Sequence, residues 1–204
     1  TNSNLRLFTV DRVGSKTPLK DVEEYTTWQQ ASPENVSDFS AVAYFFGQQL
    51  QEILDVPVGI IHSSWGGSFV EAWISKEVLS TYQDIDIENA NLARSNRVQT
   101  ALFNAMIHPL IPYTIKGMLW YQGEANRDEP ENYKKLFPAM VEDWRTRWGI
   151  GDFPFYYVQI APYMYGNNNA FGTVENTAFI REAQLKCLDL IPNSGIAITM
   201  DIGD

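Results

Sequence analysis

A cluster of polar residues follows the apolar run of residues 115–121. Gln122 and Asn126 carry side-chain amides, Glu124 carries a carboxylate, and Gly123 lies between Gln122 and Glu124. Amide N–H groups can stabilise the negative oxygen that forms during acyl transfer. We therefore predict that Gln122 is an oxyanion donor, that Glu124 holds its amide or a substrate hydroxyl in place, and that Asn126 contacts a polar substrate. Gly123 would let that substrate pass. A loop amide bonded to neighbouring backbone explains Gln122 equally well.

A double glycine follows a second apolar run, residues 56–61. A glycine N–H can point at the same oxyanion, and the missing Cβ lets a substrate approach closely. We predict that Gly67 supplies such a donor and that Trp65 and Gly66 contact the substrate. A tight turn that requires positive φ accounts for the two glycines equally well.

The nucleophile is harder to find. Ser63 and Ser64 follow the same apolar run with His62 beside them, whereas His108 is distant in the sequence. Neighbours on a strand point to opposite faces, so His62 is poorly placed to act as the base for Ser63. The Gly-x-Ser-x-Gly motif of many esterases is absent. A hydrogen-bonded structural role is the stronger interpretation for both histidines.

Metal and thiol chemistry find little support in the sequence. Cys187 is the only cysteine, which rules out an intrachain disulfide and a thiolate metal cluster. Its setting in AQLKCLDL, residues 183–190, indicates a small core residue on a helical face. No His-Glu-x-x-His motif occurs. We predict neither a metal ion nor a cofactor.

The composition is that of one ordinary globular domain. The chain has 204 residues, of which 45% are apolar and 20% charged. Its formal net charge of -10 argues against nucleic acids and anionic membrane surfaces as partners. No apolar run approaches the roughly 20 residues that a membrane-spanning helix needs. A neutral or small polar ligand fits this charge better.

The elements that position these residues are predicted from apolar periodicity. Three long segments have apolar residues at helical spacing, and another helical region covers residues 97–111. Asp38 suits the N-cap of the first helix, and Pro138 predicts a kink or break in the second. The predicted strands are 5–10, 56–61, 115–121, 153–160 and 195–200, and the long helices are 38–54, 131–148 and 177–190.

Strands that alternate with helices of this length predict an α/β fold. We expect a three-layer, doubly wound, mostly parallel sheet of flavodoxin-like type, because parallel strands are joined by helical crossovers. In such folds, ligands bind beyond the carboxyl ends of the strands. The double glycine and the cluster around Gln122 both lie at predicted strand ends, so we expect them in one site.

Three sequence blocks resemble the sialate O-acetylesterases and related carbohydrate acetylesterases of the SGNH hydrolase superfamily. They occur in order along nearly the whole chain and read VPVGIIHSSWGGSFVEAW, NAMIHPLIPYTIKGMLWYQGEANR and DFPFYYVQIAPY. The resemblance implies that a serine nucleophile and a histidine base remove acetyl groups from sugar hydroxyls without a metal. It maps the oxyanion hole to Gly67 and Gln122, with Glu124 in the same block. It also implies a periplasmic or secreted enzyme.

Two parts of the family pattern are missing from this sequence. The Gly-Gln-Ser-Asn block that carries the nucleophile on the first strand is absent, and no histidine follows the DIGD segment at residues 201–204. We therefore expect residues 1–204 to be the central part of a single SGNH-type domain, without its first strand and nearly inactive alone. A chain of this kind should form a homo-oligomer or bind a complementing chain segment, because its strand edges would be exposed.

Two alternatives remain at this point. One is a self-contained esterase that uses Ser63 or Ser64 with one of the histidines. The other is a non-catalytic carbohydrate-binding domain in which aromatic side chains stack on sugars, although such residues more often form core. Its candidate residues are Trp65, Trp73, Trp120, Tyr163 and Tyr165.

Overall fold

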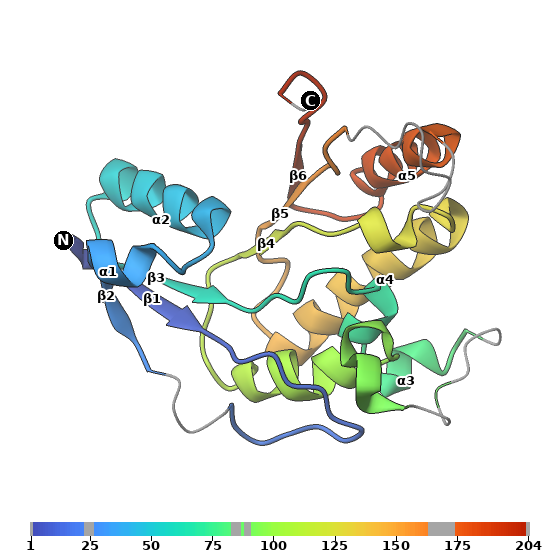
Figure 1. Ribbon diagram of the computed structural model, residues 1–204, viewed down its shortest axis with the longest axis horizontal. Coiled ribbons are helices and arrows are strands. Elements are labelled where there is room, and N and C mark those ends of the chain that lie inside the picture. The colour runs from blue at the N-terminus through green and yellow to red at the C-terminus, as the bar shows by residue number, and fades with distance from the viewer. Residues whose placement is uncertain (1, 23–26, 83–86, 88–90, 163–173, 203–204) are drawn as a thin grey trace.

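The computed structural model describes residues 2–22, 27–82, 87, 91–162 and 174–202. These residues form two separate three-stranded sheets, each with its own helices (Figure 1). Both sheets contain parallel pairs, so the expected mixture of helices with mostly parallel strands is confirmed. Tyr163 and Tyr165, which the carbohydrate-binding alternative requires, lie outside the described residues.

The first sheet has the strand order β2-β1-β3. Strand β1 (Asn2–Thr9) pairs in parallel with β3 (Val58–His62) and antiparallel with the short β2 (Gln29–Ala31). Helix α1 (Pro33–Val36) follows β2, and helix α2 (Ala41–Leu54) covers the sheet (Figure 1). Gly47 allows this close packing, because a Cβ there would lie 2.7 Å from Ile60.

The second sheet has the order β4-β5-β6 and is parallel throughout. Its strands are β4 (Met118–Trp120), β5 (Phe155–Val158) and β6 (Ser194–Ala197). Helices α4 (Pro130–Trp148) and α5 (Val174–Cys187) lie side by side (Figure 1). Their apolar faces and the inner face of the sheet bury Phe137, Phe155 and Tyr157 in the larger core.

The described strands therefore differ in one respect from the single sheet that the sequence predicts. Among the described residues, β3 pairs only with β1, and β4 pairs only with β5. Each of the two strands keeps one edge free of backbone pairing within this part of the chain. A continuous three-layer sheet stays a prediction.

Two details of the predicted helices are wrong. Helix α2 begins after Ser40, whose side chain accepts a hydrogen bond from Ala43 N, so Asp38 is not the N-cap. Helix α4 continues through Pro138, so of the predicted kink or break, the break is wrong. Pro138 cannot donate to the carbonyl of Lys134, four residues earlier. The Cys187 thiol of α5 donates to that carbonyl at 3.8 Å and so replaces the missing partner.

Residues 63–117 connect the two sheets through short irregular helices. The 3₁₀ segment η1 (Val70–Trp73) and helix α3 (Lys76–Leu79) come first. The 3₁₀ segment η2 (Leu92–Arg97) follows. Within the helical region predicted over 97–111, residues 101–110 are helical without a gap. Most of this run is not α-helical, because it consists of the π segment η3 (Phe103–Ile107) and the 3₁₀ segment η4 (His108–Leu110). No helix in the described ranges is both long and apolar enough to cross a bilayer.

Candidate active site

The side chain of Gln122 lies against the loop that follows the other sheet. It is buried, and its Nε2 donates to the carbonyl oxygen of Ser68 at 2.8 Å and to Asn126 Oδ1 at 2.7 Å. Ser68 comes directly after Gly67, so the structure brings together the double glycine and the Gln122 cluster, as the strand-end argument predicts. Both hydrogens of the amide are used in these two contacts. The Oε1 atom is buried and has no hydrogen-bond partner among the described residues.

Asn126 is in turn held by a carboxylate. Its Oδ1 accepts from Val70 N at 2.9 Å, and its Nδ2 donates to Glu71 Oε2 at 3.0 Å. Asn132 of α4 donates to the other oxygen, Oε1, at 3.4 Å. Glu71 is only 8% exposed, and burial raises the pKa of its carboxyl, an effect partly offset by hydrogen bonds from its own backbone and from Asn126.

Sequence reasoning did not identify Glu71 as a site residue. It lies in the run FVEAW, where it is the one charged residue among apolar neighbours. All four residues of η1 are buried, so the carboxylate points into the protein and not into solvent. A charge inside a buried apolar run is the signal that could have identified it, because buried charges are almost always paired.

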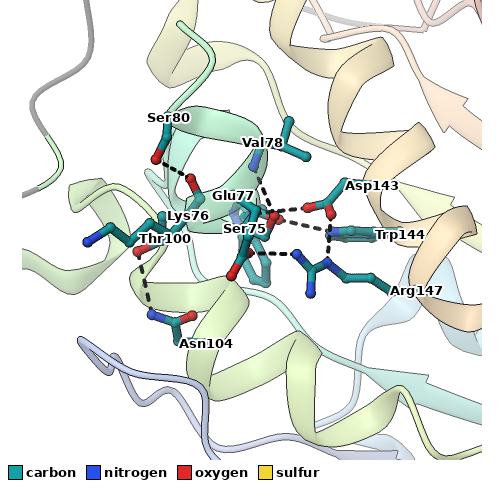
Figure 2. Close-up of polar contacts among 11 residues, drawn as sticks. Ser75, Lys76, Glu77, Val78, Ser80, Thr100, Asn104, Asp143, Trp144 and Arg147 are labelled. Atoms are coloured by element: carbon teal, nitrogen blue, oxygen red, sulfur yellow. Dashed lines mark hydrogen bonds and ion pairs between the residues drawn. The ribbon is translucent and has the colours of Figure 1, made fainter.

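The segment that carries Glu71 is fixed on α4 by a second polar cluster, shown in Figure 2. Ser75 N donates to Asp143 Oδ2 at 2.9 Å, and Trp144 Nε1 donates to Trp73 O at 3.0 Å. Arg147 Nε donates to the other oxygen of Asp143 at 2.6 Å, and its Nη2 reaches Glu77 at 2.7 Å. These contacts hold η1 and α3 against the helix that follows the Gln122 loop.

Gly66 and Gly67 form a turn at the end of the first sheet. Gly67 has a φ of 71°, so the requirement for positive φ applies to this residue. Asn96 supports the turn, because its Nδ2 donates to Gly66 O at 2.9 Å. A Cβ on Gly66 would meet nothing within 4 Å. Within the described residues, neither glycine N–H donates a hydrogen bond, and Trp65 beside them is half-buried.

Gly123 is required for packing. Its φ is 151°, and a Cβ there would lie 2.8 Å from Gln184 Nε2 and 2.9 Å from Ile160 Cγ2. The space beside Gly123 is therefore occupied by protein, so the expectation that it lets a substrate pass is wrong. Gln184 Nε2 and the Tyr133 hydroxyl both donate to the backbone carbonyl of Gln122, at 3.0 and 3.2 Å.

Contrary to the prediction from the sequence, Glu124 does not hold the side-chain amide of Gln122. It is exposed at the start of the short 3₁₀ turn Glu124–Asn126, whereas Gln122 is buried. The amide of Gln122 is held by Asn126 and Ser68, so the structure gives Asn126 the supporting contact that the sequence assigned to Glu124.

Ser63 and His108 contact backbone carbonyls, whereas Ser64 and His62 contact each other. Ser63 Oγ donates to Met106 O at 3.0 Å, and His108 Nδ1 lies 2.8 Å from Leu19 O, so both residues have structural contacts. Ser64 Oγ and His62 Nε2 lie 2.6 Å apart. Burial, followed by the charge of Arg12, lowers the pKa of His62. Its Nδ1 is buried and has no hydrogen-bond partner among the described residues.

The remaining groups add little to the site. Trp73 and Trp120 are buried in the larger core, which removes two of the described aromatic residues from the carbohydrate-binding alternative. Nowhere in the described ranges do three His, Cys, Asp or Glu residues lie close enough to hold a metal ion. A cavity beneath the loop of residues 10–22 contains none of the predicted site residues; its lining is Val10, Asp11, Val13, Leu19, Asp21, Val22 and Ala105.

The chain is similar to curated proteins from mammals. It is 30% identical to the sialate O-acetylesterase of Mus musculus and 31% identical to that of Homo sapiens. Each comparison covers 98% of this chain, but only 45% of the mouse protein and 42% of the human protein. The chain thus spans less than half the length of the curated relatives that it matches.

The chain is also similar to two solved structures. A carbohydrate acetylesterase from Xanthomonas citri superposes with a TM-score of 0.86 at 35% identity, over all of this chain and 44% of the other. A protein from Arabidopsis thaliana shares the fold at 16% identity with a TM-score of 0.60, over all of this chain and 71% of the other. The family model described as carbohydrate esterase, sialic acid-specific acetylesterase, matches residues 15–202. The chain belongs to this family of carbohydrate esterases.

Proposed function

We propose that this chain supplies the oxyanion-stabilising part of a serine esterase that removes acetyl groups from sugar hydroxyls. The observation that carries the proposal is the contact of 2.8 Å between Gln122 Nε2 and Ser68 O. This contact joins the loop that follows β3 of one sheet to the loop that follows β4 of the other sheet. It places an amide donor beside the glycine turn. Membership of the carbohydrate esterase family supports the reaction class.

In the proposed reaction, the acetyl carbonyl oxygen becomes negative when the nucleophile attacks. The N–H of Gly67 and one N–H of Gln122 stabilise that oxygen, and Gly66 leaves open space beside it. Gln122 would exchange its hydrogen bond to Ser68 O for one to the oxyanion and keep its contact with Asn126. Trp65 would form part of the substrate wall.

The nucleophilic serine and the histidine base are proposed to lie on polypeptide outside residues 1–204. Ser63 and His108 are already used in backbone contacts, and the relatives are more than twice as long as the matched region. The edges of β3 and β4 that are free within the described residues support a further strand between the two sheets, which would give the expected doubly wound domain. We propose a homo-oligomer or a complementing segment to cover these edges.

The proposed substrate is an acetylated carbohydrate. The formal charge of -10 disfavours polyanions and permits a neutral sugar ester. The family points to a periplasmic or secreted enzyme, and the mechanism needs neither metal nor cofactor.

The test compares residues 1–204 with a longer polypeptide that adds the flanking segments. Acetate release from an acetylated sugar should be near background for the short chain, because oxyanion stabilisation and binding alone leave only about 10³–10⁴ over water. The longer polypeptide should turn over, and Gln122→Ala should lower its kcat by about 10²–10³-fold. Ordinary enzyme turnover by residues 1–204 would contradict the proposal.

One observation favours a second candidate, a self-contained esterase based on Ser64. Its Oγ lies 2.6 Å from His62 Nε2, and the lowered pKa of His62 keeps that imidazole neutral and able to accept a proton. A fluorophosphonate probe, which labels activated serines, separates the two candidates. Labelling of residues 1–204 that disappears in Ser64→Ala supports the second; labelling of the longer polypeptide alone supports the first.

A further inference from the structure

We infer that Glu71 and Asn126 are positioning residues that set the direction of the Gln122 amide. This inference rests on the proposed function, because it assigns a catalytic purpose to the orientation of Gln122. The chain of contacts runs from the Glu71 carboxylate to Asn126 Nδ2 at 3.0 Å, and from Asn126 Oδ1 to Gln122 Nε2 at 2.7 Å. All three side chains are more than nine-tenths buried, with exposed fractions of 8%, 4% and 7%.

The first step concerns Gln122 itself. Its Oε1 has no hydrogen-bond partner among the described residues, so only the two contacts of Nε2 fix the amide. If the amide turned over, Oε1 would face two acceptors, Ser68 O and Asn126 Oδ1. One of the two Nε2 contacts must be released when an oxyanion is bound. The other, to Asn126, then becomes the only contact that holds the side chain.

The second step concerns Asn126, which can hold Gln122 only if its own amide cannot turn. Both oxygens of Glu71 accept from amide N–H groups, Oε2 from Asn126 and Oε1 from Asn132, so Glu71 requires the Nδ2 end of Asn126 to face it. The backbone N–H of Val70 requires the Oδ1 end on the opposite side, at 2.9 Å. The contacts with Glu71 and with Val70 N therefore favour the same orientation of the Asn126 amide. In that orientation, Asn126 presents Oδ1 as an acceptor to Gln122.

The third step is the cost of placing a carboxylate in this environment. Burial of Glu71 disfavours its charged form, and its hydrogen-bond partners Asn126 and Asn132 are neutral amides. An apolar residue in η1 would fit the surrounding core without this cost. The position of Glu71 is thus explained better by the orientation that it imposes on Asn126 than by a gain in stability.

A double-mutant cycle in the acetylesterase polypeptide that contains this sequence tests the inference. Glu71→Leu puts an apolar side chain in place of the carboxylate and removes both acceptors, and we expect kcat to fall by about 10²-fold with little change in KM. In a Gln122→Ala background the same substitution should cost little further, since Glu71 acts through Gln122. Glu71→Gln, which retains an acceptor oxygen, should restore most of the activity. Glu131→Gln serves as the control, because that exposed residue pairs with Lys134 outside the network.

Each outcome of the cycle decides a different point. An equal loss of kcat in both backgrounds would show that Glu71 is merely structural, and would overturn the inference while leaving the proposed function intact. An unchanged kcat in Gln122→Ala would instead remove the oxyanion role, and with it any catalytic role of Glu71. If Glu71→Leu does not fold, Asn126→Ala takes its place in the cycle and is judged by the same comparison.

Discussion

The Glu71 carboxylate and the Asn126 side-chain amide form a buried hydrogen bond of 3.0 Å across 55 positions of sequence. The bond joins the segment that follows β3 in the first sheet to the segment that follows β4 in the second sheet. Since Asn126 also contacts Gln122, one buried carboxylate connects the glycine loop with the amide cluster.

Glu71 should make the free energy of unfolding depend on pH. Burial raises its pKa in the folded protein above the ordinary value of about 4.3. A raised pKa means that its contribution to stability is full below about pH 4.3 and is lost as the pH rises through the folded pKa. In urea unfolding from pH 4 to 8, the stability of the wild type relative to Glu71→Gln should therefore fall with rising pH.

Glu77 provides the matched control, with the opposite sign. A backbone hydrogen bond at its own residue and the charge of Arg147 lower its pKa. Its contribution is thus present above about pH 4.3 and is lost as the pH falls. The wild type relative to Glu77→Gln should gain stability as the pH rises from 4. Parallel slopes for both variants would contradict the burial of an ionisable Glu71.

Gly123→Ala should destabilise the protein by about 2 kcal/mol or more. The substitution forces an L residue to a φ of 151° and pushes a methyl group to within 2.8 Å of Gln184. Gly66→Ala is the control, because its Cβ would meet no atom within 4 Å, and its effect should stay within about 0.5 kcal/mol. Denaturant midpoints measure both. Equal stability of the two variants would mean that α5 does not pack closely against Gly123.

Asp143→Ala should cost about 3 kcal/mol, since it removes the acceptor of both Ser75 N and Arg147 Nε in the cluster of Figure 2. Glu131→Ala, on the same helix, is the comparison. Glu131 pairs with Lys134 at 2.8 Å but is 76% exposed, so its loss should cost far less than the loss of Asp143. Urea unfolding of the two variants checks the difference, and similar losses would argue against a buried role for Asp143.

The thiol of Cys187 should resist modification in the folded protein. Burial raises its pKa to about 12, and its side chain is fully enclosed between α4 and α5. The reactive thiolate is therefore scarce at neutral pH. A thiol reagent should label this single cysteine slowly under native conditions and completely in urea. Rapid native labelling would mean that the contact with Lys134 O opens readily.

The sequence predicts the strands and long helices well where the apolar period is strong. The small core role of Cys187 is also confirmed, as is the meeting of the Gln122 cluster with the glycine loop. Strand β2 was missed because it has three residues, Gln29–Ala31, and no apolar alternation. The helical region predicted over 97–111 is present over residues 101–110, but most of it is π or 3₁₀ helix, which apolar periodicity does not distinguish from α-helix.

Some of these errors have a physical cause in common, because the contacting residues are far apart in sequence. Glu71 lies 55 positions from Asn126, so no local pattern links the two. Glu124 lies two residues from Gln122, yet Asn126, four residues away, makes the supporting contact. Pro138 predicts a helix break unless the partner of the free carbonyl, Cys187, is known.

The two sheets are supported by cores of very different size. Within the described residues, the buried cluster of the first sheet consists of Leu5, Leu7 and Ala31 of strands β1 and β2, whereas the larger core encloses the aromatic residues around α4. Local opening follows the amount of buried contact, so the amide protons of β1 and β3 should exchange with solvent before those of β5. Such a partial unfolding would detach the glycine loop at its β3 end and leave Gln122, Asn126 and Glu71 in place.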